Sequence, residues 1–414
     1  MTTGGLTELG RRVRQASVEV ARSSSAVRDQ ALSLAADLLV IDTEAILSAN
    51  RDDVLRAERD GASATSIDRL RLSPERIASM AESLRHVASL ADPVGEVLEG
   101  SVRPNGLRVS RVRVPLGVVG VIYENRPNVT SDAAGLCLKA GNAAFLRGSA
   151  SALASNQAVV AVLRRALDKA GLPVDAVALV EDTSHATAHE FMRLRGVIDC
   201  LIPRGGPALI ASLADATVPY VLDGEGNCHV YVDQAADLAM ATEIVVNAKT
   251  QRPGVCNAAE SLLVHQAVAA SFLPEVHRAL AEVELRGDER VRAILPEVTA
   301  ATEADYAAEF LGLTMSVAVV DDLDAAIAHI ARFGTGHSEA IVTADLAAAD
   351  RFVAEVDAAA VVVNASTRFI DGNELGLGAE VGISTQKLHA RGPMGIRELT
   401  CVKWVVRGEG QVRR

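Results

Sequence analysis

One cysteine of the chain lies in a context that favours chemistry. Cys256 stands in the segment NAKTQRPGVCNAAE, where a predicted helix ends in a Pro-Gly turn and a buried strand follows. A cysteine on a tight loop, beside backbone N–H groups and the guanidinium of Arg252, can have a lowered thiol pKa, and the thiolate is the nucleophilic form. A free cysteine is more often a small buried hydrophobic residue. The polar flanking sequence QRPGVCN offsets that preference, so the local pattern supports both interpretations equally.

The other four cysteines have less distinctive contexts. Cys137 falls in a predicted helix, Cys200 in a buried strand and Cys228 at the start of another strand, so we expect them to be structural, and Cys401 has no notable neighbours. Five cysteines without a CxxC pair suit a reducing cytoplasm and argue against disulfides and a structural zinc site. The nine histidines form no metal-ligand spacing, and we expect surface or capping roles for most of them. The sequence therefore predicts no metal centre.

Two further segments have residues suited to binding. In IPRGGPALI, the run Arg204, Gly205 and Gly206 leads from a strand into a helix, where free backbone N–H groups can bind a phosphate. An ordinary strand-to-helix turn has the same pattern, and no GxGxxG follows the first strand. In IYENRPNV, Asn125 comes directly after a buried strand, at the sheet edge where α/β ligands bind. Its amide could donate to a developing oxyanion, although an Asn-rich turn is the simpler alternative.

Amphipathic helices are predicted from residue 5 to about residue 92. Favourable caps stand before three of them: Ser24 or Ser25 before AVRDQALSLAADLLV, Asp42-Thr43 before EAILSANRDDVL, and Ser73-Pro74-Glu75 before RIASMAESLRHVA. This region has no residues arranged for chemistry.

Short apolar runs alternate with helical stretches from residue 116, which predicts parallel sheets covered by crossover helices. The first set of predicted strands is LGVVGVI, AAFLR (143–147), VALV (177–180), VIDCLI (197–202) and VPYVL (218–222). The second is CHVYV (228–232), ESLLV (260–264), MSVAVV (315–320), EAIVT (339–343) and AAVVVN (359–364). We therefore expect two closely joined α/β domains with a cleft near residue 225. The segment LRVSRVRV (107–114) alternates at period two, which is typical of a partly exposed strand in a subunit interface or a simple edge hairpin.

The composition is that of a soluble α/β enzyme of two domains. The chain has 414 residues, 49% of them hydrophobic and only 3% aromatic, with a net charge of −12. Scattered basic residues and few aromatics argue against nucleic-acid binding. No apolar run reaches the roughly 18 residues of a membrane span, and the first residues lack the apolar core of a signal peptide.

Taken in order, several segments resemble the aldehyde dehydrogenase superfamily, and most closely its γ-glutamyl phosphate reductase branch. They are RVPLGVVGVIYENRPNVTSDAAGLCLKAGNAAFLRG (113–148), DCLIPRGGPALI (199–210), GNCHVYVD (226–233), IVVNAKTQRPGVCNAAESLLV (244–264), FGTGHSEAIVT (333–343), VVNASTRFIDGNELGLGAEVGISTQKLHARGPMG (362–395) and KW (403–404). The resemblance runs from about residue 6 to the end, and QRPxxCN and LHARGPMG are its most specific motifs. It makes Cys256 the expected nucleophile.

The resemblance implies an aldehyde-dehydrogenase-like α/β fold with two Rossmann-like parallel-sheet domains and a small β arm. An NADPH-binding domain would comprise 1–98 and 115–225, and a catalytic domain with the nucleophilic cysteine would comprise 226–395. Residues 99–114 and 396–414 would form an oligomerisation arm, so a homo-oligomer, a dimer or larger, is expected.

The resemblance also implies roles for single residues. Asn125 and the Cys256 N–H would hold the oxyanion. Arg147 would bind the 2′-phosphate of NADPH and so favour NADPH over NADH. Glu309 would bind the nicotinamide ribose. The turn at Arg204, Gly205 and Gly206 would lie near the cofactor pyrophosphate.

Four residues on loops that flank the expected cleft are our candidates for binding the substrate's charged groups. They are Arg252, Ser366, Thr367 and Arg368. Structural salt bridges are the alternative role for both arginines.

The implied reaction is reduction of L-glutamyl 5-phosphate to L-glutamate 5-semialdehyde, in proline biosynthesis, with a separate glutamate 5-kinase upstream. Hydrolytic relatives have a glutamate base before a Gly-Gly segment, whereas Leu222 and Asp223 stand near that position here and Glu225 is out of register. An acyl phosphate reductase needs no such base. A hydrolytic aldehyde dehydrogenase and a catalytically inactive binding protein are the competing interpretations.

Overall fold

The computed structural model describes residues 3–222 and 224–413 and divides the chain into two compact units. The first unit is Met1–Leu222, Leu377–Gly382 and Met394–Arg414, and the second is Asp223–Gly376 and Ile383–Pro393. The segment 377–382 thus lies with the first unit, whereas the sequence assigned residues 226–395 to the catalytic domain. One contact that joins this segment to the first unit is a hydrogen bond of 2.7 Å between a ring nitrogen of His86 and the Gly378 carbonyl.

The first unit contains a four-stranded parallel sheet of order β5-β4-β3-β6. Its strands are β3 (Val118–Tyr123), β4 (Ala143–Arg147), β5 (Val177–Leu179) and β6 (Cys200–Arg204). All four were predicted, and their side chains are buried almost throughout, as continuous apolar runs require. The fifth predicted strand, VPYVL, is wrong as a strand: it forms only an isolated parallel bridge between Tyr220 and Leu201.

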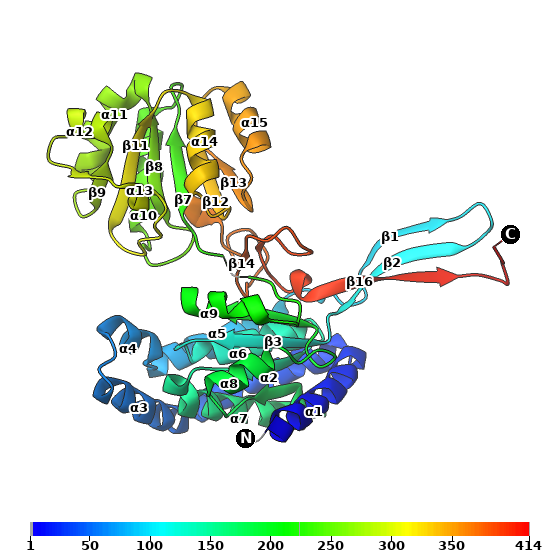
Figure 1. Cartoon of the computed structure of the whole chain (residues 1–414). Coiled ribbons are helices and arrows are strands. Elements are labelled where there is room, and N and C mark those ends of the chain that lie inside the picture. Colours follow the sequence, from blue (N-terminus) through cyan, green and yellow to red (C-terminus); the bar gives the residue numbers. More distant parts are fainter. Residues whose placement is uncertain (1–2, 223, 414) are drawn as a thin grey trace. The chain divides into compact units, whose positions relative to one another are not determined.

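Nine α-helices accompany this sheet within the described residues, and some of them pack on other helices rather than on the sheet itself (Figure 1). They are α1 (Thr3–Arg22), α2 (Ser25–Ile41), α3 (Thr43–Arg59), α4 (Ala64–Leu70), α5 (Pro74–Ser89), α6 (Asn128–Lys139), α7 (Leu153–Lys169), α8 (His185–Phe191) and α9 (Pro207–Ser212). The predicted caps at Ser24 and Ser73 are confirmed, since each hydroxyl accepts a backbone N–H of the first turn. Asp42 makes no cap bond because its carboxylate pairs with Arg165 on α7.

The first unit also has a three-stranded antiparallel arm that extends away from its sheet and helices (Figure 1). The arm consists of β1 (Val97–Val102), β2 (Arg108–Pro115) and β16 (Thr400–Arg407). The predicted strand 107–114 is therefore confirmed, but it is the central strand rather than an edge. Trp404 is 62% exposed and lies under the guanidinium of Arg111, which is 5.7 Å from the ring centroid.

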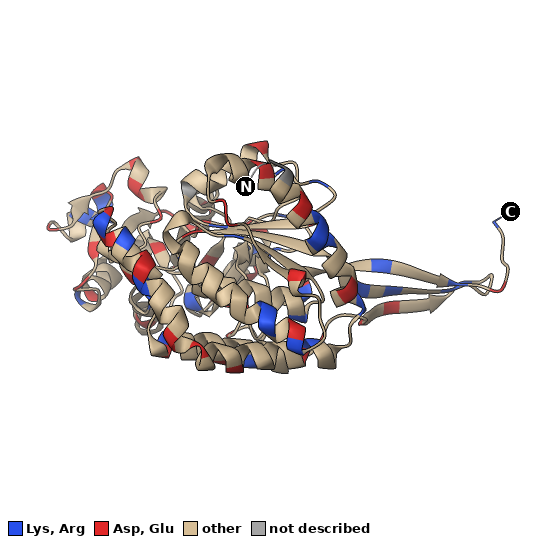
Figure 2. Ribbon diagram, turned by 90° about the horizontal axis from the view of Figure 1, so that it is seen from below, with Lys and Arg blue, Asp and Glu red and all other residues tan. Residues whose placement is uncertain are grey.

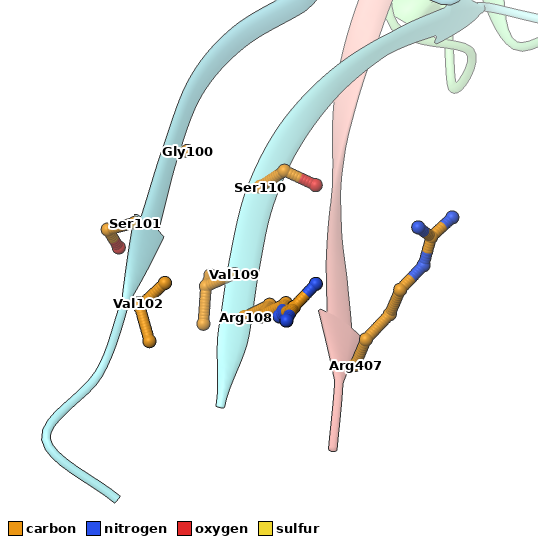
Figure 3. A pocket seen from close by; sticks show the side chains of 7 residues that line it. All are labelled: Gly100, Ser101, Val102, Arg108, Val109, Ser110 and Arg407. Carbon is orange, nitrogen blue, oxygen red and sulfur yellow. The ribbon is translucent and has the colours of Figure 1, made fainter. Parts of the chain in front are cut away.

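A shallow surface pocket lies on this arm (Figure 3). Its lining comes from all three strands: Gly100, Ser101, Val102, Arg108, Val109, Ser110 and Arg407. The lining contains no thiol, carboxylate or imidazole, so we assign it no chemistry.

The second unit is built on a seven-stranded parallel sheet of order β10-β9-β11-β8-β7-β12-β13. Its strands are β7 (Cys228–Val232), β8 (Ala259–His265), β9 (Glu284–Gly287), β10 (Thr299–Ala300), β11 (Thr314–Val320), β12 (Ser338–Val342) and β13 (Ala360–Val363). The five strands predicted for this half are confirmed, and β9 and β10 were missed because they are very short. A two-stranded ladder of β14 (Ile383–Ser384) and β15 (Gly392–Pro393) completes the unit.

Two helical layers pack on opposite faces of this sheet (Figure 1). One layer is α10 (Leu238–Thr250), α11 (Gln266–Ala279) and α12 (Glu289–Ile294), and the other is α14 (Leu323–Phe333) and α15 (Leu346–Glu355). Successive strand residues alternate between the two cores, so that Val230 faces the first layer and Tyr231 the second. A short helix, α13 (Glu303–Tyr306), lies in the connection before β11.

Charged residues are dispersed over the surface. Basic and acidic residues are interspersed along the helices in the view of Figure 2, often as ion pairs such as Arg71–Glu58 at 3.0 Å. In the part of the chain that the structure describes, no helix is both long and apolar enough to cross a membrane.

Two histidines of the second unit are exceptions to the expectation that most histidines have surface or capping roles. His229 and His337 are fully buried, and His229 Nδ1 lies 2.9 Å from the Glu339 carboxylate. Both belong to a buried polar layer around β7 and β12. His265 does cap a helix, because its Nδ1 accepts the Ala267 N–H.

Burial lowers the pKa of His337 to about 4, so the folded protein holds it neutral. The unfolded chain binds a proton near pH 6.5 and the folded chain does not, and stability therefore falls as pH drops from about 6.5 toward 4, by about 1.4 kcal/mol per pH unit. We predict that the urea midpoint decreases between about pH 7 and about pH 5, and that His337→Asn reduces this decrease. The exposed His185→Asn is the control. An identical pH dependence in wild type and His337→Asn would contradict the prediction.

Candidate active site

Cys256 is half-buried on the turn between α10 and β8, as the sequence predicted. Its carbonyl oxygen accepts the thiol of Cys228, with sulfur and oxygen 3.1 Å apart. Burial raises the pKa of Cys228 well above the usual value, so this second thiol stays protonated and can donate. Cys228 was predicted to be structural, and its specific contact is with the peptide of Cys256.

Gly226 is in the closest contact with Cys256. A β-carbon at position 226 would lie 1.5 Å from the Cys256 carbonyl oxygen, so only glycine fits there. The N–H of the same glycine donates to Glu309 Oε1 at 2.8 Å. One residue thus links the Cys256 peptide to the carboxylate that was predicted to bind the nicotinamide ribose.

The other side of the Cys256 turn is held by the segment that follows β13. Ser366 is buried, and its hydroxyl accepts the Arg368 N–H at 3.2 Å. Thr367 is fully buried, and its hydroxyl donates to the Asn257 carbonyl at 2.7 Å. These two predicted substrate residues lie beside the nucleophile, but their hydroxyls already bind the protein itself.

Arg368 is anchored by two neutral amide groups. Its Nη1 donates to Asn257 Oδ1, and its Nε donates to Gln251 Oε1 at 2.9 Å. Neither acceptor has a charge, so the guanidinium keeps its own for an anionic ligand.

The electrostatics place Arg252, Arg368 and Cys256 in one neighbourhood. Partial burial lowers the pKa of Arg368, and repulsion from Arg252 adds to this effect, whereas Asp371 and Cys256 oppose it. Arg252 itself is exposed. Arg368 thus interacts electrostatically with both Arg252 and Cys256.

The first unit presents Asn125 at the carboxyl edge of its sheet, directly after β3. The backbone has a positive φ of 34°, and the amide nitrogen donates to Ser66 Oγ at 2.7 Å and to the Ser66 carbonyl at 2.8 Å. Its amide oxygen accepts the Ser151 hydroxyl. Both amide protons are thus bound within the first unit, so donation to an oxyanion requires the amide to leave Ser66.

Arg147 and the glycine turn share this edge with Asn125. Arg147 ends β4, donates from Nη2 to the Thr183 carbonyl at 2.6 Å, and keeps a buried Nε that has no hydrogen-bond partner among the described residues. The orphaned Nε suits a phosphate oxygen as acceptor. After β6, the Gly206 N–H donates to Glu124 Oε2 at 3.1 Å. A pyrophosphate near this turn would have to displace the Glu124 carboxylate.

Comparison with known proteins now identifies the family. Residues 12–294 match the model of the aldehyde dehydrogenase family. The chain is 54% identical over 412 residues to the γ-glutamyl phosphate reductase of Thermobifida fusca and 54% identical over 408 residues to that of Carboxydothermus hydrogenoformans, with 98% of each chain covered. The crystal structure of the γ-glutamyl phosphate reductase of Thermotoga maritima has a TM-score of 0.97 and 47% identity over 99% of this chain and 100% of that one. The chain belongs to the γ-glutamyl phosphate reductase family.

As a member of the γ-glutamyl phosphate reductase family, the chain is an oxidoreductase with the aldehyde dehydrogenase fold, as its sequence predicted. The fold extends to more distant proteins: an acetylating aldehyde dehydrogenase from Geobacillus thermoglucosidasius has a TM-score of 0.71 at 16% identity. Among the described residues, no group of three or more His, Cys, Asp or Glu side chains is arranged to hold a metal ion.

Three residues around the Cys256 turn were not predicted from the sequence to contribute to the site. Gly226 stands in GEGNCH, where the glycine spacing gives no sign of the nucleophile 30 residues later. Lys249 and Glu260 flank QRPGVCN and form a fully buried ion pair. A lysine and a glutamate eleven residues apart have no helical spacing that would pair them, so only the fold shows the contact.

The contact between Gly226 and Cys256 gives a direct test of the turn. We predict that Gly226→Ala displaces the Cys256 peptide and slows alkylation of this cysteine at neutral pH by at least about tenfold, because small displacements at reacting groups have large effects on rate. Gly254→Ala, in the same turn, is the matched control, since its β-carbon would make only an ordinary contact of 3.7 Å with the Leu311 carbonyl. Iodoacetamide labelling with peptide mapping measures the rate. Equal rates for both variants would show that the contact does not position the thiol.

Proposed function

We propose that this chain reduces L-glutamyl 5-phosphate to L-glutamate 5-semialdehyde with NADPH and releases phosphate, the second step of L-proline biosynthesis from glutamate. The observation that supports it best is a half-buried cysteine in a rigid turn with two guanidiniums nearby, one of them held by neutral amides. That arrangement suits a thiolate that attacks an anionic acyl group. The names of the most similar relatives specify the acyl group as a γ-glutamyl phosphate.

The proposed reaction passes through a thioester on Cys256. The thiolate adds to the acyl carbon and forms a carbon–sulfur bond. The carbon–oxygen bond to the phosphate then breaks, and phosphate leaves with the electron pair. The thioester carbon would then be reduced by the hydride that NADPH would supply when bound. Collapse of the resulting hemithioacetal breaks the carbon–sulfur bond, which releases the aldehyde and restores the Cys256 thiolate.

The proposed substrate contacts centre on Arg252 and Arg368. The substrate has a carboxylate and a phosphate, and a guanidinium can bind either group with two parallel hydrogen bonds. Ser366 and Thr367 enter the proposal mainly through Arg368, because their hydroxyls fix the short helix η4 (Thr367–Phe369) that bears it.

The oxyanion would be stabilised by the Cys256 N–H and the Asn125 amide. A backbone N–H and a side-chain amide are the donor types that preorganised oxyanion sites use. Since Asn125 donates to Ser66 in this structure, the proposal includes an exchange of that bond for the oxyanion.

The cofactor assignment rests on the edge of the first sheet. Arg147, with its orphaned Nε, would hold the 2′-phosphate of NADPH, and the turn at Arg204, Gly205 and Gly206 would lie near the pyrophosphate. Glu309 would bind the nicotinamide ribose. Members of the aldehyde dehydrogenase family use nicotinamide cofactors, and the choice of NADPH over NADH rests on Arg147.

The partners follow from the same proposal. The arm exposes Val402, Trp404 and Val406 on β16, and a second copy of the chain would cover them in a homo-oligomer, a dimer or larger. A separate glutamate 5-kinase would supply the acyl phosphate, and we place both enzymes in the cytoplasm.

A hydrolytic aldehyde dehydrogenase is the second candidate, and it needs a base that activates water. Leu222 and Asp223 stand near the expected position of that base. Leu222 has no ionisable group, and Asp223 lies outside the described residues. Glu225 is out of register and exposed.

We predict that the reverse reaction requires phosphate. Purified protein is mixed with glutamate semialdehyde and NADP⁺, and nicotinamide absorbance is followed with and without inorganic phosphate. Repeated turnover should require phosphate, because phosphate must cleave the Cys256 thioester; without phosphate, NADPH should form only up to about one equivalent per enzyme. Repeated turnover without phosphate supports the hydrolytic candidate instead.

Cys256→Ser is the companion variant, and it should lower the rate by at least about a thousandfold while NADPH binding stays intact. Cys401→Ser, on the arm, is the matched control and should leave the rate unchanged. Near-normal turnover in Cys256→Ser would remove the thioester from the mechanism.

A substitution at Arg368 tests substrate recognition. Arg368→Ala should raise the KM for the semialdehyde or for phosphate about tenfold to a hundredfold, since a charge-assisted hydrogen bond contributes about 1.5–3 kcal/mol. Arg278→Ala, at an exposed arginine on α11, is the control. Unchanged KM values for both ligands in steady-state kinetics would exclude Arg368 from the binding site.

A further inference from the structure

A buried ion pair lies next to the Cys256 turn and has no role in the reaction described above. Lys249, near the end of α10, pairs with Glu260 Oε2 on β8, and neither side chain has exposed area. Taking two charges out of water costs several kcal/mol, and well-packed hydrophobic residues of similar volume are often more stabilising. Stability alone therefore gives no reason for this pair.

The second carboxylate oxygen of Glu260 shows what the pair contacts. Glu260 Oε1 accepts the N–H of Leu311 at 3.1 Å. Leu311 has a positive φ of 52°, a left-handed conformation that non-glycine residues adopt infrequently. The Lys249 ammonium lies 6.0 Å from the ring centroid of Phe310. The ion pair thus supports the loop that contains Glu309.

This loop closes a circuit of contacts with the nucleophile. Glu309 accepts the Gly226 N–H at 2.8 Å, and the Gly226 backbone lies against the Cys256 carbonyl. Cys256 is itself joined to Glu260 by only three intervening residues of the chain. One end of the loop is therefore fixed to the strand after the nucleophile, and the other end to the nucleophile's own peptide.

We propose that Glu260 is a positioning residue, oriented by Lys249, whose acceptor oxygen for the Leu311 N–H holds the loop 309–311 and the Cys256 turn in register and so sets the orientation of both the thiol and the Glu309 carboxylate. This inference rests on the proposed function of Cys256 and goes beyond it. Neither residue touches substrate, because both are fully buried. Burial raises the pKa of Glu260 to about 7, an effect that Lys249 opposes, so the lysine favours the carboxylate form that accepts from Leu311.

Two double variants separate this role from stability. Lys249→Met with Glu260→Leu removes both charges and the acceptor for the Leu311 N–H, whereas Lys249→Met with Glu260→Gln removes the charges and keeps an amide oxygen as acceptor. We expect Cys256 alkylation at neutral pH and kcat to fall at least about tenfold in the first variant and less than about threefold in the second. The KM for the semialdehyde should change little in both. Equal and near-normal values in both variants would overturn the proposal.

A milder variant keeps the test decisive if the leucine variant does not fold. Glu260→Asp retains the charge and the ion pair but withdraws the carboxylate from Leu311 by one methylene. The proposal expects slower alkylation of Cys256 with an upward shift of its pH profile, and unchanged alkylation and kcat would contradict it. Arg28→Met, which breaks the largely buried pair with Asp92 in the first unit, should lower the urea midpoint without changing Cys256 alkylation.

The outcomes distinguish this proposal from the proposed function. Loss of activity in Cys256→Ser together with normal alkylation in every Glu260 variant would leave the reductase assignment intact and remove the positioning role. Phosphate-independent turnover would overturn the reductase assignment, and the alkylation rates would still test the ion pair.

Discussion

The contact between the Gly226 backbone and the Cys256 carbonyl is the constraint on which the second unit's chemistry depends. It leaves no space for any side chain at position 226. The Cys228 thiol binds the same carbonyl, and the Thr367 hydroxyl binds the carbonyl of the next residue, Asn257. Three contacts therefore fix the peptides of the turn that bears Cys256. A thiol held in this way is preorganised for the proposed reaction, because the turn need not rearrange first.

The charged side chains around the Cys256 turn suit an anionic substrate. The chain has a net charge of −12, yet the side chain that binds Gln251 and Asn257 of the Cys256 turn is a cation, Arg368. Arg368 is oriented by Gln251 and Asn257, whose neutral oxygens fix the guanidinium without cancelling its charge. An anionic substrate and a thiolate both gain from that arrangement. The Lys249–Glu260 pair has a different position from Arg368. It is buried against the loop 309–311, where Glu260 binds a backbone N–H.

Local sequence patterns predicted much of this architecture. Short buried runs such as AAFLR and CHVYV became strands with the predicted bounds, because a fully apolar run flanked by turns has few other places in an α/β fold. The segment QRPGVCN predicted the turn that bears Cys256. Contacts between distant segments were not predictable: the bond from Asn125 to Ser66 spans 59 residues, and the bond from Gly206 to Glu124 spans 82. The burial of His229 and His337 was missed for the same reason, since their partners come from neighbouring strands of the folded sheet.

The proposed reaction requires that Cys256 form a thioester that phosphate, and not water, cleaves. The thioester can be detected directly by mass spectrometry: the enzyme is mixed with glutamate semialdehyde and NADP⁺ in phosphate-free buffer and quenched with acid. We expect one acyl adduct on the peptide that contains Cys256, and its loss when phosphate is added before the quench. An adduct on another residue, no adduct, or an adduct that water removes as fast as phosphate does would contradict the proposed reaction.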